Sequence, residues 1–230
     1  MSRADSMPTL LLVAACLAIV GGLAVLVLGG ATRDVDTAIT DAVRASSLRE
    51  SLAPLRVITE AGSTWAVTVL AGVALILGFL GGPWRHGVIA AAVIGLTSLA
   101  NSTMKLLVAR ERPELVDAIV TETGYSFPSG HAALGMAGWG VIAVLLWRSR
   151  LPRPGRIALV VAIGALVILI GLSRIYLGVH YPTDVLAGWA GGSVVVIVYE
   201  RITRTVSRGP AAAVVGEDRG ARRSDPPATG

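Results

Sequence analysis

The sequence predicts an all-α integral membrane protein, a bundle of six transmembrane helices. Apolar residues make up 53% of the 230 positions and charged residues only 15%, with a mean hydropathy of +0.70. There are 27 glycines but only two phenylalanines, which is the small-residue balance of helices that pack closely in lipid. The third observation is a series of six long apolar runs, at 9–30, 64–82, 87–109, 131–147, 157–176 and 183–200.

The first run, residues 9–30, carries no charge. As a helix it would be roughly 33 Å long at about 1.5 Å per residue, which matches a hydrocarbon core of roughly 30 Å. A cleaved signal peptide is the competing interpretation, but its apolar region would be only about 7 to 15 residues long. We therefore expect this run to span the membrane.

The last run, residues 183–200, is shorter and rich in glycine. Gly188 and Gly192 have the spacing of a close-packing small-residue motif. We expect them to seat this helix inside its own bundle rather than to form a dimer.

The longest connection, residues 31–63, has apolar residues at roughly helical spacing among charges. Both an interfacial amphipathic helix and a solvated helical hairpin fit this pattern. At the other end of the chain, residues 209–230 lack an apolar period, which predicts a disordered cytoplasmic tail behind a membrane domain over residues 1–208.

The basic residues predict the orientation, because cytoplasmic segments carry the excess of Lys and Arg. If both termini lie inside, the inner segments hold 12 basic residues and the outer segments hold eight. The inner ones are Arg3, Arg85, Arg148, Arg150, Arg153, Arg156, Arg201, Arg204, Arg208, Arg219, Arg222 and Arg223, and the outer ones are Arg33, Arg44, Arg49, Arg56, Lys105, Arg110, Arg112 and Arg174. The sequence therefore predicts cytoplasmic termini.

The net charge of +5 does not indicate nucleic-acid binding, because the arginines bracket apolar runs and form no basic stripe interleaved with aromatic residues. The single cysteine, Cys16, excludes a scaffold of intrachain disulfides. Lys105 is the only lysine among 20 basic residues, which agrees with a specific role for it.

Polar residues gather at the predicted outer ends of three spans. They are Lys105 and Arg112; Ser129, Gly130 and His131; and Arg174, His180 and Asp184. Charges at membrane depth cost about 2.5 to 3.5 kcal/mol each, so such a cluster indicates function. The alternative is a set of snorkelling interface residues.

Three motifs within residues 105–184 make the cluster more specific. The segments KLLVARERP (105–113), PSGH (128–131) and SRIYLGVHYPTD (173–184) resemble the three signature motifs of the phosphatidic acid phosphatase type 2 superfamily, with every fixed position filled. The resemblance implies a membrane enzyme with an outward-facing active site that removes phosphate from a lipid.

The resemblance also implies the roles of the residues. His180 would be the nucleophile that forms a phosphohistidine, oriented by Asp184, and His131 the general acid and then base. Lys105, Arg112 and Arg174, together with Ser129 and Gly130 at a helix N-terminus, would bind the phosphate.

We expect no cofactor and no metal, because the three cations would repel a metal ion from the nearby histidines and aspartate. The expected partners are the bilayer and a lipid phosphate or diphosphate, in the cytoplasmic membrane of a bacterium. The candidates are undecaprenyl pyrophosphate first, then phosphatidic acid and phosphatidylglycerophosphate. The non-enzyme alternative is an inactive lipid-binding or transport protein, but the sequence has neither an internal repeat nor a mid-span charge typical of transporters.

Overall fold

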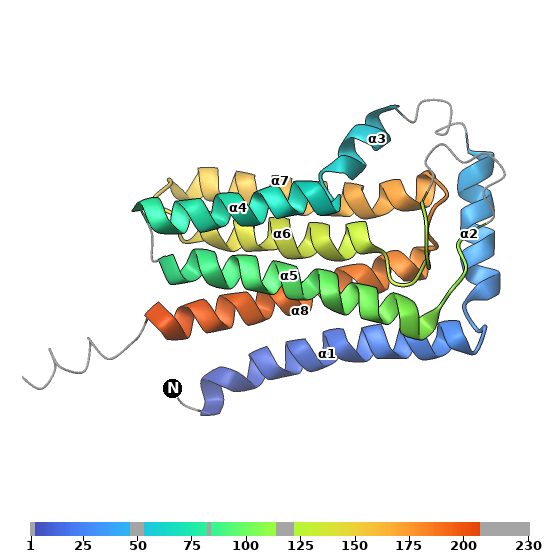
Figure 1. Ribbon diagram of the computed structural model, residues 1–230, viewed down its shortest axis with the longest axis horizontal. Coiled ribbons are helices and arrows are strands. Elements are labelled where there is room, and N and C mark those ends of the chain that lie inside the picture. Colours follow the sequence, from blue (N-terminus) through green and yellow to red (C-terminus); the bar gives the residue numbers. More distant parts are fainter. Residues whose placement is uncertain (1–2, 47–52, 82–83, 114–121, 208–230) are drawn as a thin grey trace, which may run out of the picture.

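The computed structural model describes residues 3–46, 53–81, 84–113 and 122–207. Over these ranges the chain is helical, with turns and irregular connections between the helices (Figure 1). The helices are α1 (Arg3–Leu28), α2 (Arg33–Ala45), α3 (Ala53–Glu60), α4 (Thr64–Gly81), α5 (Trp84–Val108), α6 (Gly130–Trp147), α7 (Arg153–Tyr176) and α8 (Pro182–Ser207).

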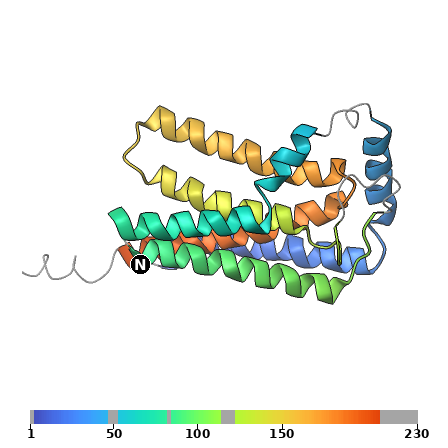
Figure 2. The same cartoon turned by 45° about the horizontal axis from the view of Figure 1, so that its top comes forward.

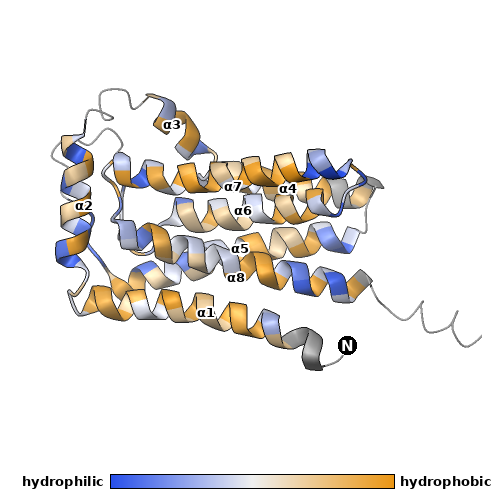
Figure 3. Cartoon of the chain, turned by 180° about the vertical axis from the view of Figure 1, so that it is seen from behind, coloured by the Kyte–Doolittle hydropathy of each residue, from blue (hydrophilic) through white to orange (hydrophobic). Residues whose placement is uncertain are grey.

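The predicted transmembrane bundle is confirmed. Helices α1, α5, α6, α7 and α8 are each long and apolar enough to cross a membrane, and the pair α3 and α4, bent by 41°, brings the number to six if it is counted as one span. The exposed faces of the helices are largely hydrophobic along the bundle, as expected for a surface covered by lipid (Figure 3). The start of α1 and the end of α8 lie at the same end of the bundle (Figure 1).

The bend between α3 and α4 has a packing reason. A Cβ atom on Gly62 would lie 2.5 Å from Ile170 and 2.9 Å from the carbonyl oxygen of His131, so only glycine permits this close approach to α6 and α7. Ser63 then starts α4, where its hydroxyl accepts a hydrogen bond from the Ala66 N–H at 3.3 Å. The predicted second span, residues 64–82, corresponds to α4, which continues from α3 at this bend.

Helix α6 lies in the middle of the bundle and packs against α4, α5, α7 and α8. Its contact with α8 depends on the two glycines singled out in the sequence. A Cβ on Gly188 would lie 2.6 Å from the carbonyl oxygen of Ser129, and one on Gly192 would lie 2.6 Å from that of Ala133. The prediction that these glycines seat α8 within its own bundle is confirmed.

The 31–63 connection contains two helices, α2 and α3. Helix α2 runs crosswise to the bundle at the end where α1 stops (Figures 1 and 2). Its buried residues are polar, Asp36 and Thr40, whereas Val35 and Ile39 are exposed. Helix α2 thus turns polar groups toward the protein, and its position at the membrane interface stays a prediction. The predicted tail, residues 209–230, lies outside the described residues.

Candidate active site

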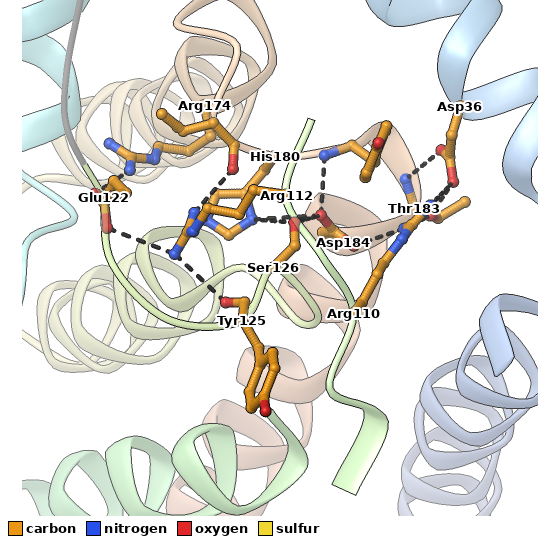
Figure 4. Close-up of polar contacts among 12 residues, drawn as sticks. Asp36, Arg110, Arg112, Glu122, Tyr125, Ser126, Arg174, His180, Thr183 and Asp184 are labelled. Atoms are coloured by element: carbon orange, nitrogen blue, oxygen red, sulfur yellow. Dashed lines mark hydrogen bonds and ion pairs between the residues drawn. The ribbon is translucent and has the colours of Figure 1, made fainter. Parts of the chain in front are cut away.

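The residues of the three motifs meet at the end of the bundle that α2 crosses. Lys105 lies in the last turn of α5, Arg112 in the following connection, Ser129, Gly130 and His131 at the start of α6, Arg174 in the last turn of α7, His180 in the α7–α8 turn, and Asp184 in the first turn of α8. The close-up in Figure 4 shows the polar contacts among Arg112, Arg174, His180 and Asp184.

His180 is held by the backbone of the turn that carries it. The carbonyl oxygen of Arg174 accepts hydrogen bonds from the N–H groups of Val179 (3.2 Å) and His180 (3.3 Å). Gly178 has a φ of +74°, a conformation that favours glycine, and lets the chain reverse there. Arg174 and His180 are thereby fixed relative to each other by the main chain.

The contacts of the His180 ring define its tautomer. Nδ1 lies 3.4 Å from Oδ2 of Asp184, and Nε2 lies 3.2 Å from NH1 of Arg112. A guanidinium can only donate, so Nε2 must be the acceptor and Nδ1 must carry the proton. The lone pair of Nε2 therefore points toward Arg112, away from Asp184.

His180 is 2% exposed. Burial lowers its pKa to about 4, although the hydrogen bond and charge of Asp184 oppose the shift. The ring is thus neutral at pH 7, the state in which Nε2 can act as a nucleophile.

Arg112 is held mainly by backbone oxygens. Its Nε donates to the Gly124 carbonyl (3.0 Å) and NH1 to the Val179 carbonyl (2.8 Å). Burial lowers the pKa of Arg112, while the charges of Glu122 and Asp184 oppose that shift. Because arginine remains protonated in proteins, Arg112 brings a fixed positive charge to the open side of the His180 ring.

Arg174 is 1% exposed and donates from NH1 to Thr59 Oγ1 at 2.9 Å. Its NH2 forms a charged hydrogen bond with Glu122, which also lies 3.7 Å from Arg112. Burial opposes ionisation of Glu122, but the surrounding cations, Arg174 first, outweigh it and hold the pKa of this carboxyl below its ordinary value. Glu122 was not predicted from sequence, and its single negative charge is shared between two of the three predicted phosphate ligands.

Among the described residues, the buried polar atoms without a hydrogen-bond partner include Ser129 Oγ and Arg174 Nε, both at this end of the bundle. Ser129 occupies the N-cap position of α6, yet its hydroxyl makes no cap bond. Its backbone N–H instead donates to the carbonyl oxygen of Asp184 at 3.0 Å, which ties the start of α6 to α8. Unpaired buried groups are costly, so they indicate a ligand site.

Lys105 donates from Nζ to the carbonyl oxygen of Tyr125 at 2.6 Å. His131 makes no side-chain hydrogen bond with the described residues, but it lies within electrostatic range of Arg174, Glu122 and Lys105 and of the His180 ring. The ring of His131 is thus left available near the cations and the His180 ring.

The Asp184 carboxylate accepts hydrogen bonds from several groups besides His180, the one partner that the sequence predicted for it. Its Oδ2 accepts from the hydroxyl of Ser126 and from the Tyr181 N–H (2.9 Å), and its Oδ1 accepts from Arg110 at 2.7 Å. Ser126 and Arg110 both lie close to motif residues, but neither is a fixed motif position. Among the described residues, no group of three or more His, Cys, Asp or Glu side chains could hold a metal ion.

Together, the helical bundle and this cluster define a multi-pass membrane protein with a buried histidine–aspartate pair beside three cations. The model of the PAP2 superfamily matches residues 86–208, which is more than half of the chain and includes all three motifs. The chain belongs to the PAP2 superfamily.

Individual proteins agree with this membership. Phosphatidylglycerophosphatase B of Bacillus subtilis is 32% identical over 124 residues, which cover 53% of this chain and 60% of the relative. An undecaprenyl-diphosphatase of Sulfolobus acidocaldarius is 41% identical over 71 residues, covering 31% of this chain and 30% of the relative. The matches thus span 60% or less of these relatives.

A solved structure covers more of the chain. The crystal structure of a transmembrane PAP2-type phosphatidylglycerolphosphate phosphatase from Bacillus subtilis has a TM-score of 0.77 at 27% identity, and the match covers 86% of this chain and 98% of that one. The likeness therefore includes nearly all of that protein's fold.

Proposed function

We propose that this protein is a membrane lipid phosphatase that hydrolyses a lipid diphosphate or phosphomonoester through a phosphohistidine on His180. The observation that carries the proposal is the position of Nε2 of His180: its lone pair faces Arg112 NH1 at 3.2 Å, while Nδ1 faces Asp184. A neutral nucleophile is thus directed at a fixed cation, where a phosphate oxygen would bind.

The reaction has two displacements. Nε2 of His180 attacks phosphorus, an N–P bond forms, and the P–O bond to the lipid breaks as His131 gives its proton to the leaving oxygen. Water then attacks phosphorus, His131 takes one of its protons, and the N–P bond breaks to release phosphate. Asp184 stabilises the positive charge that the His180 ring carries in the intermediate.

Lys105, Arg112 and Arg174, with Ser129 and the N–H groups at Gly130, would stabilise the charge on the phosphoryl oxygens. Support comes from Ser129 Oγ and Arg174 Nε, which are buried without partners and would gain them from a phosphate. Binding would also require the phosphate to replace the carboxylate of Glu122 on Arg174 and Arg112. These cations supply the positive charge that metal ions provide in other phosphoryl-transfer enzymes.

The proposed location is the cytoplasmic membrane, with cytoplasmic termini and the site on the outer face. Support comes from the 12-to-8 distribution of basic residues and from the start of α1 and the end of α8, which lie at the end of the bundle opposite α2 (Figure 1). In a Cys16→Ser background, Asp41→Cys on α2 should react with an impermeant thiol reagent in intact cells, and Arg153→Cys should react only after lysis. If Arg153→Cys were labelled in intact cells, the orientation would be the opposite of the one proposed here.

The outer-face site favours a polyprenyl diphosphate as substrate, because such lipids are released on that leaflet whereas phosphatidic acid is made at the inner one. The relatives' names support both a polyprenyl diphosphate and phosphatidylglycerophosphate. We therefore place undecaprenyl pyrophosphate first, with phosphatidic acid and phosphatidylglycerophosphate as the alternative substrates.

Phosphate release from these three lipids by the purified protein, in matched detergent and with excess EDTA, tests the function and the order together. We expect turnover in EDTA and the highest kcat/KM for undecaprenyl pyrophosphate. A tenfold preference for phosphatidic acid, about 1.4 kcal/mol in transition-state binding, would reverse the order. Release from none of the lipids would contradict the proposed function, and activity lost in EDTA and restored by one divalent ion would contradict a purely cationic site.

A further inference from the structure

Asp36 of α2 is a carboxylate that the mechanism above does not use. It is fully buried, and it lies 148 positions before Asp184 in the chain. It accepts hydrogen bonds from the Thr183 N–H (3.1 Å) and hydroxyl (2.6 Å) and from NH2 of Arg110 (2.7 Å). Helix α2 is thus fastened to the residue that precedes Asp184.

Arg110 connects this carboxylate to the one behind His180. Its NH2 bonds to Asp36 Oδ2 and its NH1 to Asp184 Oδ1, each at 2.7 Å, and its guanidinium stacks on the Tyr181 ring with 4.1 Å between Cζ and the ring centre. Figure 4 shows Arg110 between the two aspartates. A planar guanidinium held at both ends cannot rotate without breaking a buried ion pair.

The two oxygens of Asp184 therefore have different partners. Oδ1 accepts a hydrogen bond from Arg110, whereas Oδ2 faces Nδ1 of His180 at 3.4 Å and accepts a hydrogen bond from the Tyr181 N–H. Because Arg110 fixes Oδ1, it also fixes the rotation of the carboxylate and hence the direction from which Oδ2 meets the imidazole. This direction selects the Nδ1–H tautomer and leaves Nε2 free to attack.

Charge gives Asp36 a second effect. Arg110 alone beside Asp184 would cancel the negative charge that stabilises the cationic ring of the phosphohistidine. With Asp36 on its other side, the three groups sum to one negative charge, and that charge remains beside His180. Arg110 can then orient Asp184 without removing its electrostatic effect.

From these contacts we infer that Asp36 and Arg110 are positioning residues for the nucleophile, acting through Asp184. The inference rests on the proposed function. Orienting partners one contact removed from a reacting group are typically worth about 10- to 100-fold in activity.

The test is a double-mutant cycle on the full-length protein in detergent, with phosphate release from undecaprenyl pyrophosphate as the readout. Asp36→Asn keeps the shape of the side chain and should lower kcat by about 10- to 100-fold with KM within about twofold, since no substrate contact is lost. The matched control is Asp41→Asn, which removes an exposed acid from the same helix and should leave kcat unchanged.

The Asp184→Asn background separates positioning from general destabilisation. If Asp36 acts through Asp184, then Asp36→Asn should have little further effect on the residual activity of Asp184→Asn. Equal losses in both backgrounds, or a wild-type kcat for the folded Asp36→Asn protein, would overturn the inference. If Asp36→Asn does not accumulate, Arg110→Lys replaces it in the cycle under the same criteria, because lysine keeps the charge but cannot bridge both carboxylates. An inactive wild-type protein would instead contradict the proposed function.

Discussion

Replacing His180 with alanine should lower the kcat for phosphate release by about 10³-fold or more, a loss of about 4 kcal/mol or more of transition-state stabilisation. The side chain supplies the only nitrogen that is buried, neutral and directed at Arg112 within the cluster described above. Without it, the covalent route is lost, and only the binding and charge stabilisation of the cations remain.

The measurement is single-turnover phosphate release by purified variants of matched thermal stability. His86→Ala is a suitable control, because it removes a histidine from the first turn of α5, at the opposite end of that helix from Lys105. His131→Ala should lose most of the activity but less than His180→Ala, since water can replace a proton donor but not the nucleophile. A wild-type rate for His180→Ala would show that another group attacks phosphorus.

Replacing Arg174 with lysine should lower kcat/KM by about 10²-fold, or about 2.7 kcal/mol, although the charge is conserved. The buried guanidinium is oriented by Thr59 and keeps Nε without a partner, so it can offer a phosphate an N–H that lysine cannot place there. If the Arg174→Lys variant kept the wild-type kcat/KM, a directional contact between this guanidinium and the phosphate would be contradicted.

Glu122→Gln should change phosphate binding in the opposite direction. The carboxylate pairs with both arginines, so an incoming phosphate must displace it. Removing its charge should lower the inhibition constant of inorganic phosphate by roughly three- to tenfold. Glu111→Gln, which removes an exposed acid from the same connection, is the control for general electrostatics and should change it little. Weaker inhibition in Glu122→Gln would mean that this carboxylate helps to bind phosphate.

Much of the fold followed from the sequence because lipid imposes a simple rule on it. Uncharged runs long enough to cross the bilayer must form helices, and the glycine spacing in α8 marked where that helix meets α6. The bent pair of α3 and α4 was missed, because α3 is short and polar enough to resemble a connection, and its direction depends on the packing of Gly62 against α6 and α7.

Some residues of the candidate site could likewise be predicted from the sequence, and others could not. The motif residues were found because their spacing is fixed within short segments, and the six-span topology brings three such segments to one end. Asp36, Arg110 and Glu122 were missed because their significance depends on contacts across the fold: a carboxylate on α2 cannot be paired with Asp184 until α2 is known to lie across the bundle.

A phosphohistidine on His180 can be detected by locating the covalent phosphate on the protein. The wild-type protein would be mixed with lipid substrate labelled in the transferred phosphate, quenched in alkali during turnover, and digested for peptide mapping. We expect an alkali-stable, acid-labile label on the peptide that contains His180, and no label in His180→Ala. A label on any other side chain, such as an acid-stable phosphate on Ser126 or Ser129, would contradict the mechanism.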